Sequence, residues 1–166
     1  MQIAIHNDPL GKYYNMMKGQ FLKFIPKGPN AVLDIGCGSG RLGESLRKEG
    51  KASNIIGVEI FPPAAQQANK TYDHVYVGNI ESMELDYLEH FDFIICGDII
   101  EHLVDPWRFV GRIHHWLKKD GTVLCTLPNI RFWLILYEII FRGIWQYRDE
   151  GILDKTHLRF FTNKTA

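Results

Sequence analysis

Three glycines spaced two residues apart form the part of this sequence best suited to binding a ligand. They lie in Gly36-Cys-Gly-Ser-Gly40, directly after a short apolar run, where the backbone must turn sharply and approach its ligand closely. Larger side chains would block that approach, so the loop predicts a nucleotide-type ligand at the N-terminus of the following helix. The overlapping Gly38-Ser-Gly-Arg-Leu-Gly43 also matches the GxGxxG pattern of dinucleotide sites, which leaves a nucleotide-linked dehydrogenase as an alternative.

Two acidic residues near this loop help to choose between the possible ligands. Asp34 lies at the end of the preceding apolar run, where a carboxylate would repel a pyrophosphate and attract a cationic group, directly or through water. A loop-capping side chain is the other interpretation of Asp34. Glu59 lies near the end of the next apolar run, where one carboxylate can accept both ribose hydroxyls. Dehydrogenases use the same device, so Glu59 indicates the fold and not the reaction.

Short apolar runs alternate with amphipathic stretches from residue 31 to residue 127, which predicts repeated βα units. Near-continuous apolar strands separated by helices indicate a parallel sheet buried on both faces, and right-handed crossovers leave few topologies. We therefore expect an α/β fold of the Rossmann-like, doubly wound type, with parallel strands in the order 3-2-1-4-5. The expected strands are 31–35, 55–60, 74–77, 91–96 and 122–127, and the first two expected helices are 41–48 and 62–70.

A third helix is expected to open at Asp105-Pro106, because Asp can cap a helix and Pro suits its first turn. Lys119-Asp-Gly121 is expected to form a turn before the fifth strand. The helical spacing predicts a buried stripe made of Trp107, Val110, Ile113 and Leu117.

Val32-Leu-Asp-Ile-Gly-Cys-Gly-Ser-Gly40 resembles motif I of the class I S-adenosylmethionine-dependent methyltransferases in every position. After the third strand that family usually has an acid for the adenine amino group, and here Asn79 offers an amide oxygen without the charge. A turn residue is the other interpretation of Asn79. The run from Cys96 to Pro106 is similar to the family's motif IV region, and Leu117 to Asn129 resembles its strand-five block. Together these blocks cover residues 32–129.

The resemblance implies S-adenosyl-L-methionine as the cofactor and S-adenosyl-L-homocysteine as the product. By the same resemblance, the backbone near Cys96 and Gly97 would contact the methionine part, and Asp98 would face the cleft between cofactor and acceptor. Glu101 and His102 would lie on the turn to the next helix, with His102 in a capping or interhelical hydrogen bond. The expected cofactor-binding residues are Asp34, Gly36, Cys37, Gly38, Gly40, Glu59, Ile60, Asn79, Ile80, Cys96, Gly97 and Asp98.

A signature nucleophile is not expected, because methyl transfer from a sulfonium is an in-line displacement whose leaving group is already activated. The sequence offers no nucleophilic triad and no metal-like spacing of His and Cys, so no metal is expected. The segment from Gly151 to Thr162 resembles one found in methyltransferases of the ubiquinone-biosynthesis and sugar-tailoring types. Within it, His157 is the best candidate catalytic base, since a neutral imidazole can accept a hydroxyl proton. The other interpretation is that His157 and Arg159 tie this segment to the sheet.

The segment 130–166 is expected to select the acceptor, and its aromatic residues cover most of a helix circumference. Such a helix must be covered, as core, as a lid over an apolar acceptor, as a dimer surface or as a shallow membrane contact. The resemblance also leads us to expect strands six and seven, for which the chain is too short. A fragment or an abbreviated member would expose the edge of strand five, which favours dimers.

With 46% hydrophobic and 23% charged residues in 166, the composition is that of one soluble globular domain. We expect residues 1–30 to form an N-terminal helical cap, 31–129 the cofactor-binding core, and 130–166 the acceptor side. Nineteen basic residues balance nineteen acidic ones, which favours a small-molecule acceptor over nucleic acid. Three cysteines without CxxC spacing, and an N-terminus unlike a secretory signal, predict a cytoplasmic protein. The apolar run 132–141 is too short to span a membrane.

The sequence therefore predicts a methyltransferase that uses S-adenosylmethionine and acts on a small molecule. An oxygen acceptor on a sugar, a quinone or a lipid-linked glycan is preferred. A nicotinamide-type oxidoreductase is one alternative, and a non-catalytic member of the fold that only binds cofactor or a partner is another.

Overall fold

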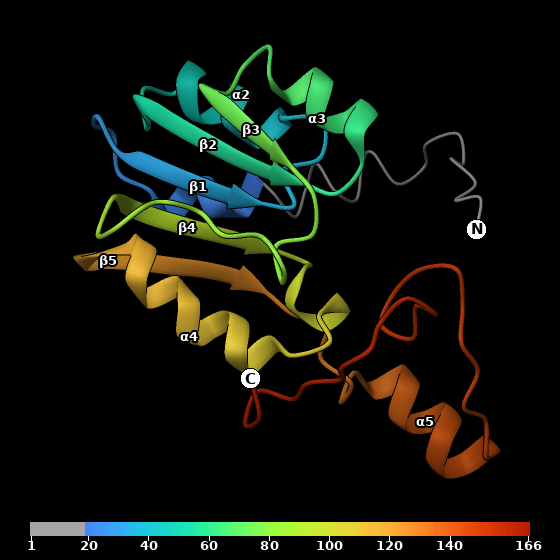
Figure 1. The fold of residues 1–166 in the computed structure, drawn as a ribbon. Helices are drawn as coiled ribbons and strands as arrows, with labels where there is room; N and C mark the ends of the chain where they lie inside the picture. The colour runs from blue at the N-terminus through green and yellow to red at the C-terminus, as the bar shows by residue number, and fades with distance from the viewer. Residues whose placement is uncertain (1–18) are drawn as a thin grey trace.

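The structure is a computed structural model that describes residues 19–166, and Figure 1 shows a twisted sheet with helices on both faces. Five strands lie in the order β3-β2-β1-β4-β5, and every neighbouring pair is parallel. This Rossmann-like order confirms the expected fold, and the first and third strands have the expected bounds. The strands are β1 (Ala31–Ile35), β2 (Asn54–Glu59), β3 (His74–Val77), β4 (Phe91–Gly97) and β5 (Leu117–Thr126).

Helices connect the strands as the alternating pattern predicts. Of the helical cap expected over residues 1–30, residues 1–18 lie outside the described residues, and residues 19–21 are helical. The helix α2 has the predicted bounds, whereas α3 ends two residues before the expected end at residue 70. The elements are η1 (Leu22–Phe24), α2 (Arg41–Lys48), α3 (Pro62–Ala68), η2 (Ile100–His102), α4 (Pro106–Trp116) and α5 (Trp133–Arg142).

The central strand β1 divides the core into two faces. All five of its residues are buried, and alternate side chains point to opposite sides of the sheet. Val32 packs in a cluster with Leu42 of α2, whereas Leu33 packs in a second cluster with Phe109 of α4. Asp34 shares the face of Val32, so the strand carries a carboxylate into the α2 side of the core.

The buried face of α4 differs from the expected one. Trp107 is 66% exposed and Val110 is 45% exposed, while Leu117 belongs to β5, so the predicted stripe was wrong at three of its four positions. A second apolar stripe with helical spacing lies beside the first, and periodicity alone does not choose between them. The ring of Trp107 is partly covered by Arg159, whose guanidinium carbon lies 5.8 Å from the ring centre. The buried residues of α4 are Pro106, Phe109, Ile113 and Trp116.

The edge strand β5 begins at Leu117, before the expected Thr122. Leu117 pairs with Phe91, and the next pair joins Thr122 to Phe93, so two steps along β4 match five along β5. The turn expected at residues 119–121 is therefore an irregularity inside the strand.

After β5 the chain forms α5, which Figure 1 shows lying away from the sheet. Ile135 is the one buried residue of α5, while Trp133 and Phe141 are 66% and 76% exposed. The chain then returns to the sheet domain, where Phe161 bridges Asn129. Among residues 19–166 no strand follows β5. No helix in this described part is long and apolar enough to cross a membrane.

Candidate functional site

The glycine loop, residues 36–40, lies where β1 and β2 both end. The backbone N–H groups of Gly36 and Cys37 donate to the carbonyl of Val58, at 2.8 and 3.1 Å. The N–H of Gly38 donates to Glu59 Oε2 at 2.8 Å. The loop is therefore fastened to the end of β2, and the predicted Glu59 carboxylate stands directly beside it.

The three loop glycines all have positive φ, but they meet different surroundings. A Cβ on Gly36 would lie 2.2 Å from Ile99 Cδ1, and one on Gly40 would lie 2.8 Å from the backbone of Ala68. A Cβ on Gly38 would meet nothing within 4 Å. Gly36 and Gly40 are thus required by packing, whereas Gly38 leaves its side of the loop open, as close approach by a ligand requires.

Asp34 lies at the end of β1, just before the loop, and its side chain contacts Tyr72, a residue that sequence reasoning missed. The carboxylate is 1% exposed and accepts a hydrogen bond of 2.5 Å from the Tyr72 hydroxyl. Burial, and then the Asp34 charge, raise the pKa of Tyr72 well above its ordinary value. The hydroxyl also accepts from the N–H of Gly43 at 3.1 Å. Asp34 is therefore linked through Tyr72 to the first turn of α2, and its contact with the cofactor stays a prediction.

Glu59 has the geometry that a ribose-binding carboxylate needs. Its Oε1 accepts from the N–H of Phe61 at 2.9 Å, while Oε2 accepts from Gly38, so two backbone donors fix the carboxylate in place. Each carboxylate oxygen retains a lone-pair position after one such bond. The neighbouring Ile60 is 68% exposed and offers an apolar surface beside the acid.

The predicted adenine-binding residues lie in the turn after β3. Asn79 is exposed, and its Oδ1 accepts from the N–H of Glu81 at 2.9 Å, which is the geometry of a turn residue. Its second lone pair leaves the predicted adenine bond possible. Ile80 directs its side chain into the core, where it is 5% exposed.

The end of β4 presents a sharp turn rather than a nucleophile. Cys96 is fully buried, and burial raises its pKa far above the ordinary thiol value, so it is an inert thiol. Gly97 lies against the ring of Phe21, 3.2 Å from where a Cβ would be. Asp98 adopts a positive φ of 54°, and its N–H and Oδ1 both bond the Thr126 hydroxyl at 3.0 Å. Thr126 therefore fixes the turn on which Asp98 is presented.

A second group of ionisable residues, which we call the Glu101 cluster, consists of Glu101, His102 and His157. Sequence reasoning assigned Glu101 no chemical role, yet it is fully buried and neither of its carboxylate oxygens has a hydrogen-bond partner. Burial raises the pKa of Glu101 to about 8. His157 Nε2 lies 4.0 Å from Glu101 Oε1, and the two imidazole rings are 4.8 Å apart. The sequence signal that could have predicted this cluster was an adjacent Glu and His in the turn after a strand, together with a further His in the segment that returns to the sheet.

The predicted base, His157, is held by the protein on several sides. Its side chain is 7% exposed, and its Nδ1 lies 3.0 Å from the carbonyl of Ile152. The N–H groups of Leu158 and Arg159 donate to the carbonyl of Glu101 at 2.8 and 3.0 Å. This backbone strap matches the interpretation that the segment is tied to the sheet, and the base role stays a prediction.

His102 directs Nδ1 to the carbonyl of Thr156 at 3.2 Å, so it also joins the turn to the returning segment. Burial lowers the pKa of His102, which keeps the ring neutral at physiological pH. One ligand atom from each member of the cluster lies within 4.8 Å of the other two. Because carboxylate and imidazole also bind divalent cations, the expectation of a metal-free site is still untested.

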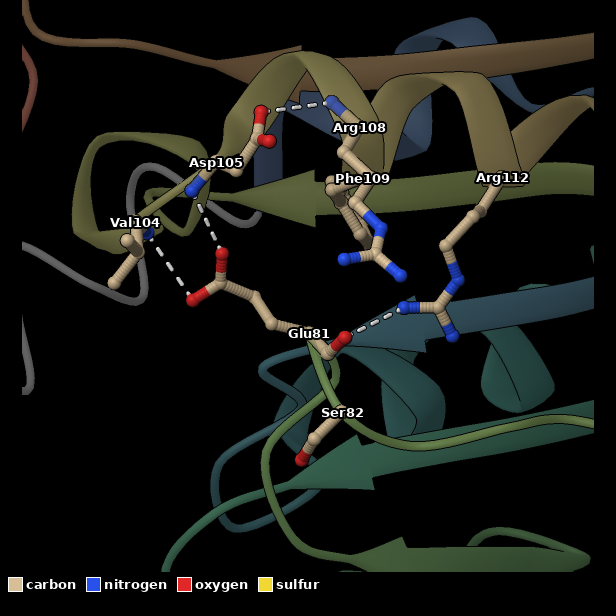
Figure 2. A pocket seen from close by; sticks show the side chains of 7 residues that line it. All are labelled: Glu81, Ser82, Val104, Asp105, Arg108, Phe109 and Arg112. Atoms are coloured by element: carbon tan, nitrogen blue, oxygen red, sulfur yellow. Dashed lines mark hydrogen bonds between the residues drawn. The ribbon is translucent and has the colours of Figure 1, made fainter.

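A surface pocket of about 250 Å³ lies between the turn after β3 and the start of α4. Figure 2 shows Glu81 reaching across to the backbone N–H groups of Val104 and Asp105, at 3.1 and 2.8 Å. Arg112 donates to the carbonyls of Ile80 and Glu81 from the other side. These bonds fasten the predicted adenine turn to α4. The residues that line the pocket therefore hold this turn in place.

Comparison with known proteins identifies the family. The family described as "Methyltransferase domain" matches residues 12–165. The ubiquinone biosynthesis O-methyltransferase of Coxiella burnetii is 32% identical over 116 residues, which are 66% of this chain and 48% of that protein. The mitochondrial ubiquinone biosynthesis O-methyltransferase of Bos taurus is 32% identical over 107 residues, 59% of this chain and 28% of that protein. The matched part of the chain thus spans about half the length of the Coxiella relative and less than a third of the bovine one.

A solved structure from Thermotoga maritima, described as a SAM-dependent methyltransferase and possible histamine N-methyltransferase, aligns with a TM-score of 0.66. It is 24% identical and covers 94% of this chain and 68% of its own, a likeness that speaks for the fold. Together with the family match, which spans the glycine loop, Glu59 and the Glu101 cluster, it leaves the dehydrogenase alternative without support. The chain belongs to the methyltransferase-domain family and has the Rossmann-like fold of class I S-adenosylmethionine-dependent methyltransferases.

Proposed function

We propose that this chain binds S-adenosyl-L-methionine at the glycine loop and transfers its methyl group to an oxygen atom of a small molecule. The observation that carries the proposal is the 2.8 Å bond between the Gly38 N–H and Glu59, beside the open side of Gly38. A fixed carboxylate at the end of β2 suits ribose hydroxyls, and an unobstructed glycine suits close backbone approach. Family membership adds the methyl donor to this nucleoside-type site.

The cofactor would supply a methyl group already activated on a sulfonium, so the protein mainly has to bind, align and exclude water. In this proposal Glu59 holds the ribose, the turn at Asn79 and Ile80 holds the adenine, and the loop glycines admit the backbone of the ligand. The Gly97-Asp98 turn, fixed by Thr126, borders the acceptor.

An oxygen acceptor is supported by the Coxiella and bovine relatives, whose names state O-methylation in ubiquinone biosynthesis. A quinone, a sugar or a lipid-linked glycan is the acceptor class that we propose. The neutral charge balance favours these over nucleic acid. Three free cysteines fit a cytoplasmic location, which we include in the proposal.

His157 is our proposed acceptor of the hydroxyl proton. When Nδ1 donates to the Ile152 carbonyl, Nε2 carries the lone pair. The acceptor hydroxyl would give its proton to Nε2 as its oxygen bonds to the methyl carbon and the carbon–sulfur bond of the sulfonium breaks, which would leave S-adenosylhomocysteine. For this to happen the acceptor must reach the side of the ring that now faces Glu101.

The first experiment is calorimetry of the chain with S-adenosylhomocysteine and, separately, with NAD. We expect binding of the former alone, weakened more than tenfold by Glu59→Ala because both ribose contacts are lost. The matched control is Glu84→Ala, an acid whose side chain is 93% exposed. Binding of NAD without binding of S-adenosylhomocysteine would refute the cofactor assignment.

The second experiment supplies labelled methyl donor and a small-molecule extract, and it compares the chain with the His157→Ala variant. We expect label in an ether-linked product, and at least a tenfold lower rate for the variant. Cofactor binding with no labelled product would support the non-catalytic alternative. Equal rates for the two proteins would remove His157 as the base.

A further inference from the structure

Tyr72 occupies a slot made by three glycines. A Cβ on Gly43 would lie 2.2 Å from the Tyr72 ring, one on Gly57 would lie 3.0 Å away, and one on Gly40 would lie 3.2 Å away. Each glycine comes from a different element: the glycine loop, α2 or β2. Any larger residue at these positions would push the ring out, so the slot is shaped around Tyr72.

This packing gives the GxGxxG match a different cause from the one it has in dinucleotide sites. There the third glycine lets the helix approach the strand closely. Here Gly43, the third glycine, faces the ring of Tyr72, which comes from the segment after α3. In this chain the second and third glycines of the pattern therefore leave space for an aromatic ring between α2 and the sheet.

The hydroxyl at the end of that ring joins β1 and α2, the two elements on either side of the glycine loop. It donates to Asp34 at 2.5 Å and accepts from the Gly43 N–H in the first turn of α2 at 3.1 Å. Tyr72 is 5% exposed and Asp34 is 1% exposed, so this bond is shielded from water. A shielded, charge-assisted bond of this length holds a carboxylate in one orientation.

We infer that Tyr72 is a positioning residue that orients the Asp34 carboxylate toward the amino-acid end of the bound cofactor. The inference rests on the proposed function, and it names the part of the ligand that the pair serves. A carboxylate favours an ammonium or sulfonium group, directly or through water, and has no comparable attraction for the adenosine part. Glu59 and the turn after β3 serve adenosine instead.

The test compares two ligands that differ at this end, S-adenosylhomocysteine and methylthioadenosine, which lacks the amino-acid part. Tyr72→Phe keeps the ring in the glycine slot and removes only the hydroxyl. We expect this variant to bind S-adenosylhomocysteine about tenfold more weakly, which corresponds to one charge-assisted hydrogen bond, and methylthioadenosine with affinity changed less than about twofold. Asp34→Asn should reproduce the pattern if Tyr72 acts through Asp34.

The control is Tyr76→Phe, which removes a hydroxyl that lies 3.3 Å from that of Tyr87. Tyr76 packs against the core cluster of Leu33 and Phe109, whereas Tyr72 belongs to the other cluster. The control variant should change neither affinity. Equal losses for both ligands in Tyr72→Phe, or no loss for either, would overturn the inference. If Tyr72→Phe does not fold, Asp34→Asn still tests the premise, because an Asp34→Asn variant without a selective loss of S-adenosylhomocysteine affinity would overturn the inference. Failure of the unmodified chain to bind S-adenosylhomocysteine would instead overturn the proposed function, and this inference with it.

Discussion

The glycine-loop edge and the Glu101 cluster both bury carboxylates, but they treat them differently. Asp34, which is buried, accepts a hydrogen bond from a tyrosine hydroxyl, and Glu59, which is half-buried, accepts hydrogen bonds from two backbone N–H groups. Glu101 is as deeply buried as Asp34, yet its two oxygens have no donor, and the ring nitrogen Nε2 of His157 is 4.0 Å away. Burying an ionised carboxylate without donors is costly, so Glu101 retains a proton to a higher pH.

This difference separates a region built for fixed geometry from one that tolerates an unsatisfied group. Fixed donors and acceptors around Gly38 suit a ligand that must always bind in the same pose. A carboxyl without partners beside two imidazoles is a departure from good packing, and such departures concentrate at functional sites. The two regions should therefore respond to mutation in different ways, and four substitutions test this.

Among the four test substitutions, the largest effect is expected from Gly40→Ala. The residue has φ of 88°, and a Cβ would lie 2.8 Å from the Ala68 backbone, so left-handed strain adds to overpacking. We expect a loss of about 3 kcal/mol in the free energy of unfolding, measured by urea titration. The control is Gly143→Ala at the end of α5, which has φ of 62° with nothing within 4 Å and should lose only about 1 kcal/mol. Equal losses would mean that the loop edge is no more tightly packed than the C-terminal region.

The tightly packed region is also the one that sequence predicts best. The bounds of β1 and α2 follow from a buried apolar run and a glycine loop, both of which are local signals. Tyr72 was missed because its partners Asp34 and Gly43 are distant in sequence and nothing local marks them. Contacts of this kind depend on topology, which a single sequence states only through its family resemblance.

Errors were concentrated in the region with competing signals. α4 carries two neighbouring apolar stripes, and the stripe with Phe109 and Trp116 was buried because it faces β5 and the core. The role of Glu101 depends on its contact with His157, which is 56 positions away in the sequence, and no periodicity shows such a contact. The expected alternatives for the aromatic helix α5 stay open, since most of its apolar side chains are exposed in this chain.

The second prediction concerns pH and Glu101→Gln. The folded-state pKa is raised from 4.5 to about 8, so between these values the native protein holds a proton that the unfolded chain has lost. The free energy of unfolding therefore falls by a few kcal/mol as pH rises through this window. Glutamine has no proton to lose, so the variant should gain on the wild type by that amount between about pH 5 and pH 8.

Urea midpoints at the two pH values, measured with EDTA present, check this prediction. The groups that face Glu101 are the rings of His157 and His102, with the Asp98 and Asp154 charges raising its pKa further. His102, whose pKa is lowered, is neutral in the upper part of the window. A constant difference between variant and wild type would show that Glu101 is ionised in the native protein throughout.

A smaller effect is expected from Thr126→Val, which removes the hydroxyl that closes the turn at Asp98. The Asp98 N–H and carboxylate both lose a partner, so we expect a loss of about 1 kcal/mol in the free energy of unfolding by urea titration. Thr122→Val, at an exposed position of the same strand, is the control and should be within about 0.5 kcal/mol of the wild type. A similar loss in both variants would attribute the effect to the strand rather than to the turn.

The smallest effect on stability is expected from Phe141→Ser, at a residue that is 76% exposed on α5. Because the ring buries little surface within the chain, the free energy of unfolding should change by less than about 0.5 kcal/mol. Phe109→Ala, at a buried ring of α4, should by contrast cost about 4 kcal/mol. Light scattering of the wild type and of Phe141→Ser then tests what covers the exposed face of α5, because it measures association between chains, which urea unfolding of a monomer does not report. If the wild-type chain is a dimer and Phe141→Ser is a monomer, the aromatic helix is a subunit interface. If both have the mass of one chain, its exposed rings serve an acceptor, a membrane surface or another protein.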